Sequence, residues 1–157
     1  MAMERTLILI KPDAIQRGLI GEIVGRFERK GLKIIGLKMM SLNEAILREH
    51  YAHLADKAFY PSLEKFMMGS PTIAVCIEGV EVVNAVRLLC GITKARAAEA
   101  GSIRGDLAMS QACNVVHASD SSENAIKEVS RFFKENELYD YQKTEYEHVY
   151  NEEELAV

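Results

Sequence analysis

The sequence contains no tryptophan, only three prolines and only three cysteines among its 157 residues. Cys76, Cys90 and Cys113 are isolated from one another, and no CxxC pair is present to indicate a zinc site. All three lie in or beside apolar runs, where a reduced cysteine packs as a small hydrophobe. We therefore expect a reducing compartment, and we expect the protein to be cytoplasmic.

Signals for membranes and for secretion are also missing. No stretch approaches the roughly 20 apolar residues that a membrane-spanning helix needs. The first residues, MAMERTLILIKPD, have too short an apolar run and the wrong order of charge for a signal peptide. The sequence thus predicts no membrane partner.

Charge is nearly balanced, with 19 Lys and Arg against 23 Asp and Glu, for a net charge of −4. This balance argues against nonspecific binding of nucleic acid over the whole surface, although it is compatible with a local basic cluster. The 48% hydrophobic content is that of a soluble globular chain. With no repeat or linker evident, we expect one domain over residues 1–157, with 151–157 as a frayed tail.

Hydrophobic periodicity predicts four strands interleaved with two main crossover helices. The strands are expected at 5–10, 32–40, 70–77 and 114–117, and the crossover helices at 19–29 and 80–89. Shorter helices, broken at Pro61, are expected within 43–68. This order fits an α+β protein, a ferredoxin-like α/β sandwich with a four-stranded antiparallel sheet and helices packed on it. A doubly wound parallel sheet competes, because periodicity alone does not separate the two.

Local residue chemistry indicates two further segments. Residues 91–109 hold few core-forming residues and are long for a loop, which is typical of a functional loop. A last helix is expected to open at Asp120 with the capping box Asp120 to Glu123. Its buried stripe is expected to comprise Ala125, Ile126, Val129, Phe132 and Phe133.

The segment 114–121, NVVHASDS, places His117 at the end of a short apolar strand, just before that helix. Alternation predicts that His117 faces away from Val116 and to the same side as Val115. A lone histidine there is most often a satisfied core residue. Lys11, Arg87, Thr93 and Arg104 lie near element ends or in the long loop and could share an anion-binding pocket. Each alone is equally typical of a solvated surface, and spacing does not show that they converge.

Several of these segments resemble nucleoside diphosphate kinases. Residues 114–121 match the NxxH(G/A)SDS signature of that family. Further matches are TLILIKPD at 6–13, QRGLIGE at 16–22, EHY at 49–51 and IRGD at 103–106. The likeness runs without gaps from about residue 4 to residue 150.

The resemblance implies a ping-pong transfer of the γ-phosphate of a nucleoside triphosphate to a nucleoside diphosphate through a phosphohistidine on His117. A neutral imidazole nitrogen is nucleophilic near pH 7, which suits this role. The resemblance implies attack by Nδ1, with Nε2–H held by the carboxylate of Glu128. Without it, Glu128 would be interpreted as a solvated acid on a helix face. Ser119 and Ser121 either support this pair or cap the helix.

The resemblance also assigns residues to the nucleotide. They contact phosphates or sugar, the ribose hydroxyl or the base, and are Lys11, Tyr51, Phe59, Arg87, Thr93, Arg104 and Asn114. Phe59 would stack on the base, and stacking accepts any base because every base has a π-face. Broad base tolerance is therefore expected. Mg²⁺ is expected to be held mainly through nucleotide phosphates, without a dedicated protein site.

The resemblance further implies a homo-oligomer, either a hexamer or a tetramer. The loop 91–101 lacks the prolines and the serine that many family members carry there, where it packs at subunit contacts. Lys57 and Ala58 also stand where an Arg-Pro pair is frequent. Neither departure touches a residue expected to react.

Two other functions are alternatives to this one. A catalytically silent nucleotide-binding regulatory module would be expected to have lost His117, Lys11 or Arg104, and all three are present. A phosphohistidine hydrolase would need a second base to position water, and the sequence names none. His50 and His53 have a spacing that could ligate metal, but no acidic or cysteine partner is evident for them, so no metal is expected there.

Overall fold

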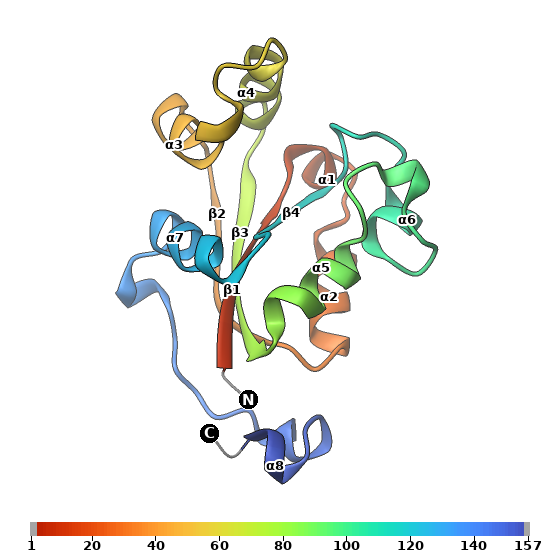
Figure 1. Cartoon of the computed structure of the whole chain (residues 1–157), viewed down its shortest axis with the longest axis vertical. Helices are drawn as coiled ribbons and strands as arrows, with labels where there is room; N and C mark the ends of the chain where they lie inside the picture. Colours follow the sequence, from red (N-terminus) through yellow and green to blue (C-terminus); the bar gives the residue numbers. More distant parts are fainter. Residues whose placement is uncertain (1–2, 156–157) are drawn as a thin grey trace.

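The computed structural model describes residues 3–155 and contains a four-stranded sheet in the order β2-β3-β1-β4. The strands are β1 (Met3–Ile10), β2 (Lys33–Met40), β3 (Thr72–Val80) and β4 (Val116–Ala118). Every pairing is antiparallel, so the ferredoxin-like prediction is confirmed and the parallel alternative is wrong (Figure 1).

The central strand β1 pairs with β3 on one side and β4 on the other. Its residues Leu7, Ile8, Leu9 and Ile10 are all fully buried. A strand that is covered on both faces has a continuous apolar run in place of polar alternation. The run that ends before Lys11 therefore marks the middle of the molecule.

Helices cover both faces of the sheet (Figure 1). Ile8 and Ile10 pack with α2 (Ile20–Arg29) and α5 (Val82–Cys90) on one face. Leu7 and Leu9 pack on the other face with three helices, which are α3 (Glu44–His50), α4 (Tyr60–Met68) and α7 (Ser122–Phe132). The helices α3 and α4 extend beyond the end of the sheet and form a lobe, which we call the α3–α4 lobe.

The structure adds short helices that periodicity did not indicate. These are α1 (Pro12–Gln16), η2 (Ala95–Ala97), α6 (Ile103–Leu107), η3 (Glu135–Glu137), η4 (Thr144–His148) and α8 (Glu152–Leu155). Within 43–68, where short helices were expected, the structure also contains η1 (Ala52–Leu54). The segment 91–109 is therefore partly helical, and Ala95 and Ile103 within it join the core. The described part of 151–157 contains α8, a single turn without buried residues, and the frayed tail stays a prediction. Residues 156 and 157 lie outside the described part.

Two expectations about α7 are corrected. Ile126 is 70% exposed, because Ala125, Val129 and Phe132 already define the buried face of this helix. The N-cap is Ser121, whose hydroxyl accepts a hydrogen bond from the Asn124 backbone N–H. Asp120 lies one residue earlier and accepts from the Asn124 side chain, so it does not cap the helix.

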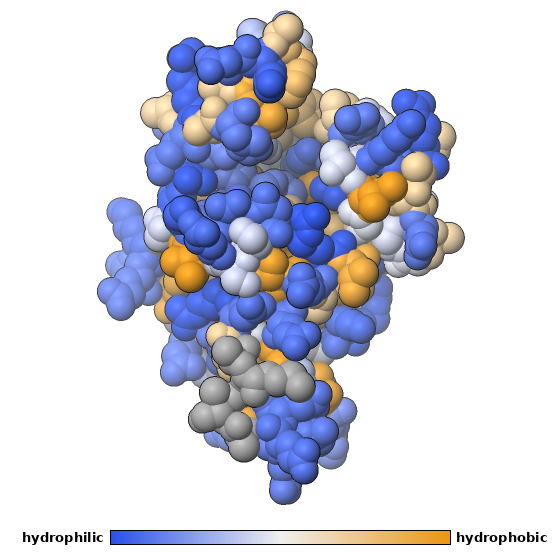
Figure 2. Space-filling model, viewed as in Figure 1, coloured by the Kyte–Doolittle hydropathy of each residue, from blue (hydrophilic) through white to orange (hydrophobic). Residues whose placement is uncertain are grey.

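The face shown in Figure 2 is mostly hydrophilic and carries separate apolar patches. Within residues 3–155, no helix is both long and apolar enough to cross a membrane.

Candidate active site

A cavity of about 920 Å³ lies between the α3–α4 lobe and the segment that carries α6. Figure 2 shows the surface hollowed between these two parts of the molecule. Its lining includes His117 and all the residues expected to bind nucleotide, namely Lys11, Tyr51, Phe59, Arg87, Thr93, Arg104 and Asn114. Cavities of this size hold small-molecule ligands. The convergence that spacing did not show is thus present in the structure.

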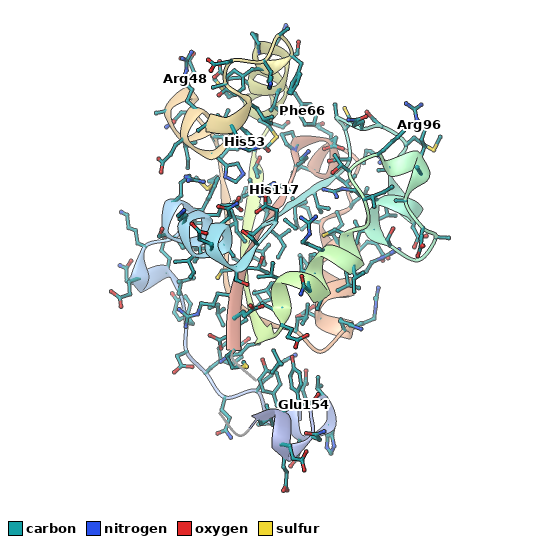
Figure 3. The ribbon with its side chains drawn as sticks, viewed as in Figure 1. Arg48, His53, Phe66, Arg96, His117 and Glu154 are labelled. Carbon is teal, nitrogen blue, oxygen red and sulfur yellow. The ribbon has the colours of Figure 1, made fainter. Side chains whose placement is uncertain are left out.

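His117 lies on β4 in the middle of the molecule, below the lobe that carries His53 and Phe66 (Figure 3). It pairs with Leu9 of β1, so it faces the same side of the sheet as Leu9. Val116 is buried on the opposite side, as alternation predicted.

Val115 does not follow that alternation. Its φ of 65° is in the left-handed region, and its side chain joins the same core cluster as Val116. The prediction that His117 and Val115 share a face is therefore wrong. A β-branched residue at positive φ is strained, and two hydrogen bonds hold it here. Val115 N–H donates to Asp13 Oδ2 (3.1 Å), and its carbonyl accepts from Lys11 N–H (2.9 Å).

Behind the cavity, His117 Nε2 lies 2.9 Å from Glu128 Oε2, and the Ser119 hydroxyl donates to the same oxygen (2.7 Å). Burial raises the pKa of Glu128, but the hydrogen bond from His117, its charge and the Ser119 hydroxyl bring that pKa below its usual value. The carboxylate is therefore ionised and acts only as an acceptor. In the neutral imidazole the proton is then on Nε2, which leaves Nδ1 with a free lone pair.

The two serines of the signature have different roles. Ser119 is buried, and its hydroxyl also accepts from the Leu7 backbone N–H (3.2 Å), so it holds Glu128 against β1. Ser121 caps α7. The sequence left both roles open for each residue.

Hydrogen bonds organise the basic end of the cavity, which is formed by Lys11, Arg87, Thr93, Arg104 and Asn114. Lys11 is only 7% exposed, and its Nζ donates to Asn114 Oδ1 (2.7 Å). Asn114 in turn donates from Nδ2 to the Thr93 carbonyl (3.0 Å). Burial, followed by the nearby charge of Arg104, lowers the pKa of Lys11 to about 8.

Arg104 fixes the loop to the sheet. Its buried guanidinium donates to three carbonyls, those of Gly91 (2.7 Å), Val116 (2.6 Å) and Asn114 (3.3 Å). Burial lowers the pKa of Arg104 from its ordinary value. The neighbouring Gly105 has no room for a side chain, because a Cβ there would lie 1.9 Å from the Glu99 carbonyl oxygen.

The apolar end of the cavity is formed by Leu54, Phe59, Leu63 and Phe66 of the α3–α4 lobe. Phe59 stands at the start of α4 and is 53% exposed, so its ring face is open to a ligand. Tyr51 lies deeper, with its ring centroid 6.3 Å from that of His117, and burial raises the pKa of its hydroxyl.

His50 is a residue of this site that the sequence interpretation missed. Its ring centroid lies 4.5 Å from that of His117, whereas His53 is exposed. His50 and His53 therefore lie in different environments, one buried and one exposed. A ring nitrogen of His50, one of His117 and a Glu128 oxygen lie within 4.8 Å of one another. However, Arg131 Nη1 donates to His50 Nδ1 (3.1 Å), which puts the proton of the neutral ring on Nε2. The tautomer thus works against metal binding at His50.

Comparison with known proteins gives a consistent result. The family model described as "Nucleoside diphosphate kinase" matches residues 4–138. A nucleoside diphosphate kinase of Parabacteroides distasonis is 52% identical over 140 residues, which are 89% of this chain and 92% of that protein.

Two solved structures are also similar. A nucleoside diphosphate kinase of Halobacterium salinarum in complex with CDP has a TM-score of 0.93 at 40% identity, covering 96% of this chain and 100% of that one. The second structure is a transition state mimic of the nucleoside diphosphate kinase of Borrelia burgdorferi with bound vanadate and ADP, and it has a TM-score of 0.87 at 36% identity. It covers 92% of this chain and 95% of its own.

Proposed function

The chain belongs to the nucleoside diphosphate kinase family and is a phosphotransferase, and we propose that it carries the phosphoryl group on His117. The observation that supports this proposal best is the 2.9 Å contact between His117 Nε2 and the ionised Glu128. That contact leaves Nδ1 as the nucleophile at the cavity wall.

In the first half-reaction, Nδ1 of His117 attacks the γ-phosphorus of a nucleoside triphosphate. An N–P bond forms, the P–O bond to the β-phosphate breaks, and the nucleoside diphosphate leaves. The Glu128 carboxylate accepts a hydrogen bond from Nε2–H of His117, so that proton stays on the ring. The carboxylate also stabilises the positive charge that develops on the ring. In the second half-reaction, an acceptor diphosphate attacks the phosphohistidine by the reverse path.

The basic end of the cavity would hold the phosphates. Lys11 and Arg104 are buried and oriented by hydrogen bonds before any nucleotide binds, which reduces the reorganisation needed in the transition state. Arg87 and Thr93 line the same end. We assign Lys11 and Asn114 to the ribose hydroxyl as well.

Mg²⁺ fits this cavity only when it is bound to the phosphates of the nucleotide. The lining contains one carboxylate, Asp120, besides the cations Lys11, Arg87 and Arg104. Such a donor set does not form an oxygen cage for a hard dication, so phosphate oxygens would be its main ligands. When bound, the ion supplies further neutralisation of phosphate charge.

At the apolar end, Phe59 would stack on the base without reading its edges. The two relatives with bound nucleotides support base tolerance, because one holds CDP and the other ADP. We expect adenine, guanine, cytosine and uracil diphosphates to differ modestly in kcat/KM. A preference above about a thousandfold for one base would require directed hydrogen bonds that a stacking residue does not supply.

Assembly and location are also proposed. We propose one domain that assembles into a hexamer or a tetramer, because the edge strand β2 exposes Leu37 and Met39. A cytoplasmic location is proposed from the free cysteines Cys76, Cys90 and Cys113, which suit a reducing compartment.

Steady-state kinetics tests the covalent intermediate. Initial rates are measured against donor concentration at several fixed acceptor concentrations. The proposal predicts parallel double-reciprocal lines, since the phosphoenzyme separates the two half-reactions. Intersecting lines that persist at low substrate would point to direct transfer in a ternary complex.

A further inference from the structure

His50, the last residue of α3, is buried against the reactive pair, although no step described above uses it. It is 5% exposed. Its ring meets those of His117 (4.5 Å, 77°), Tyr51 (4.7 Å, 69°) and Phe132 (5.1 Å, 88°) edge-to-face. The contact joins two helices that flank His117, because α3 packs on α7. In Figure 1, α3 lies above α7, and α7 lies beside the sheet strands near β4, which carries His117.

The hydrogen-bonding state of His50 follows from its neighbours. Arg131 cannot accept a hydrogen bond, so its contact with His50 Nδ1 at 3.1 Å requires a lone pair on that nitrogen. Arg131 is itself held by an ion pair with Glu49 (3.0 Å). The neutral ring of His50 therefore carries its proton on Nε2.

The ring is also kept neutral. Burial, and next the nearby charge of His117, lower the pKa of His50 to about 3. Glu128 opposes this shift, while Arg131 and His53 add to it. At neutral pH the ring of His50 is therefore uncharged.

The other ring nitrogen of His50 is Nε2. This nitrogen is buried and has no hydrogen-bond partner among residues 3–155. Leaving such a donor unpaired is unfavourable, so an apolar ring would be the more stable choice if this position served packing alone. A ring nitrogen of His50 lies within 4.8 Å of a Glu128 oxygen and of a His117 ring nitrogen. A neutral N–H near a carboxylate favours the ionised form, and an ionised Glu128 fixes the proton of His117 on Nε2.

We propose that His50 is a positioning residue for His117: as the Nε2–H tautomer set by Arg131, it holds the His117 ring with Nε2 on Glu128 and Nδ1 toward the cavity. This inference rests on the proposed function of His117. It adds a chain of contacts from Glu49 through Arg131 and His50 to the reactive ring. The role is to favour one tautomer and one ring orientation, without touching the nucleotide.

His50→Phe tests this role because it keeps an aromatic ring and removes both nitrogens. We expect single-turnover phosphorylation to slow by roughly three- to thirtyfold, the effect of one hydrogen-bonding group, while nucleotide affinity stays within about twofold. His50→Gln offers an amide oxygen to Arg131 and an N–H to the pair, so it should restore most of the rate. His148→Phe is the matched control, since His148 is exposed on η4.

Tautomer populations give a readout that packing alone would not change. With ¹⁵N-labelled histidine, NMR should show His117 of the unmodified protein as the Nε2–H form and a mixed population in His50→Phe. Should His50→Phe fail to fold, Arg131→Met leaves His50 in place and is expected to give the same mixing with a smaller loss of rate.

Failure of this inference differs from failure of the proposed function. If the unmodified protein takes no phosphate on His117, the proposed function is wrong. If it is phosphorylated but His50→Phe and Arg131→Met keep both the rate and the tautomer, the positioning role is wrong. Equal losses in His50→Phe and His50→Gln, with the His117 tautomer unchanged, would also overturn it and leave His50 as a packing residue.

Discussion

At the basic end of the cavity the polar side chains are buried and hydrogen-bonded to one another, whereas the apolar end presents a half-exposed ring. Lys11 is fixed by a hydrogen bond to the Asn114 side chain, and Arg104 by hydrogen bonds to three backbone carbonyls. Phe59 stands at the start of a short helix with its ring open. Charge that must be placed accurately in the transition state lies on the rigid side. Recognition that must tolerate several ligands lies on the open side.

The largest effect is expected at the point where the chemistry occurs. His117→Ala removes the covalent nucleophile and should reduce turnover to less than about a hundredth. Nucleotide affinity should stay within a few fold, because the basic and apolar ends are untouched. Turnover and a binding titration measure the two quantities, with the exposed His148→Ala as control. Retention of more than a hundredth of the turnover would contradict the role of His117.

Glu128→Gln is expected to have the next largest effect. The amide keeps the size of the side chain but loses the anion that holds the Nε2 proton of His117. Phosphoenzyme formation should slow by about ten- to a thousandfold, as expected for one charged hydrogen bond. Rapid quench in single turnover measures this rate.

Glu123→Gln is the matched control for that prediction, because Glu123 is an exposed acid on the same helix. A normal phosphorylation rate in Glu128→Gln would reduce Glu128 to an ordinary helix-face acid.

Phe59→Ala probes the apolar end. Loss of one stacking contact at a half-exposed position should weaken nucleotide binding by roughly fivefold, the lower part of the range for such contacts. The loss should be similar for all four bases, with kcat at saturation little changed. Leu88→Ala is the control, since Leu88 is exposed outside the cavity. A loss confined to one base would show that this end reads base edges.

The last prediction concerns pH, where the effect is small close to neutrality. The pKa of Lys11 is lowered to about 8, so its ammonium is charged below that pH and becomes neutral above it. We expect kcat/KM to fall above pH 8, by at most about tenfold per pH unit. Bound phosphates stabilise the charge, so kcat should begin to fall only at higher pH.

Lys11→Arg should abolish this basic limb, because arginine stays charged throughout that range. Lys127→Arg, on the exposed face of α7, is the control. An unchanged limb in Lys11→Arg would assign the titration to another group.

Much of the fold was predictable because it depends on local periodicity. The run before Lys11 and the spacing of apolar residues in α2 and α5 correctly predicted strand and helices. The helix α1 was missed, although Pro12 stands in its first turn, where proline is favoured. Ile126 was assigned to the buried stripe, but consecutive residues of a helix lie about 100° apart, so it turns away from the buried face.

The sequence predicted which residues belong to the site, but it did not predict the contacts between them. Arg104 and Asn114 were known candidates, but their contacts depend on the left-handed turn at Val115, which alternation cannot foresee. His50 could have been found from its spacing, because it follows the buried Leu47 by one turn of α3. Its contact with His117 joins residues 67 positions apart in a chain of 157, and that proximity needs the three-dimensional structure.

Direct labelling tests the central claim. The protein is incubated with γ-³²P-labelled ATP and Mg²⁺, freed of nucleotide and then given an unlabelled nucleoside diphosphate. We predict acid-labile, base-stable phosphate that maps to His117 and passes quantitatively to the added diphosphate. Label on another residue, or label on His117 that leaves as free phosphate instead of reaching the acceptor, would contradict the account.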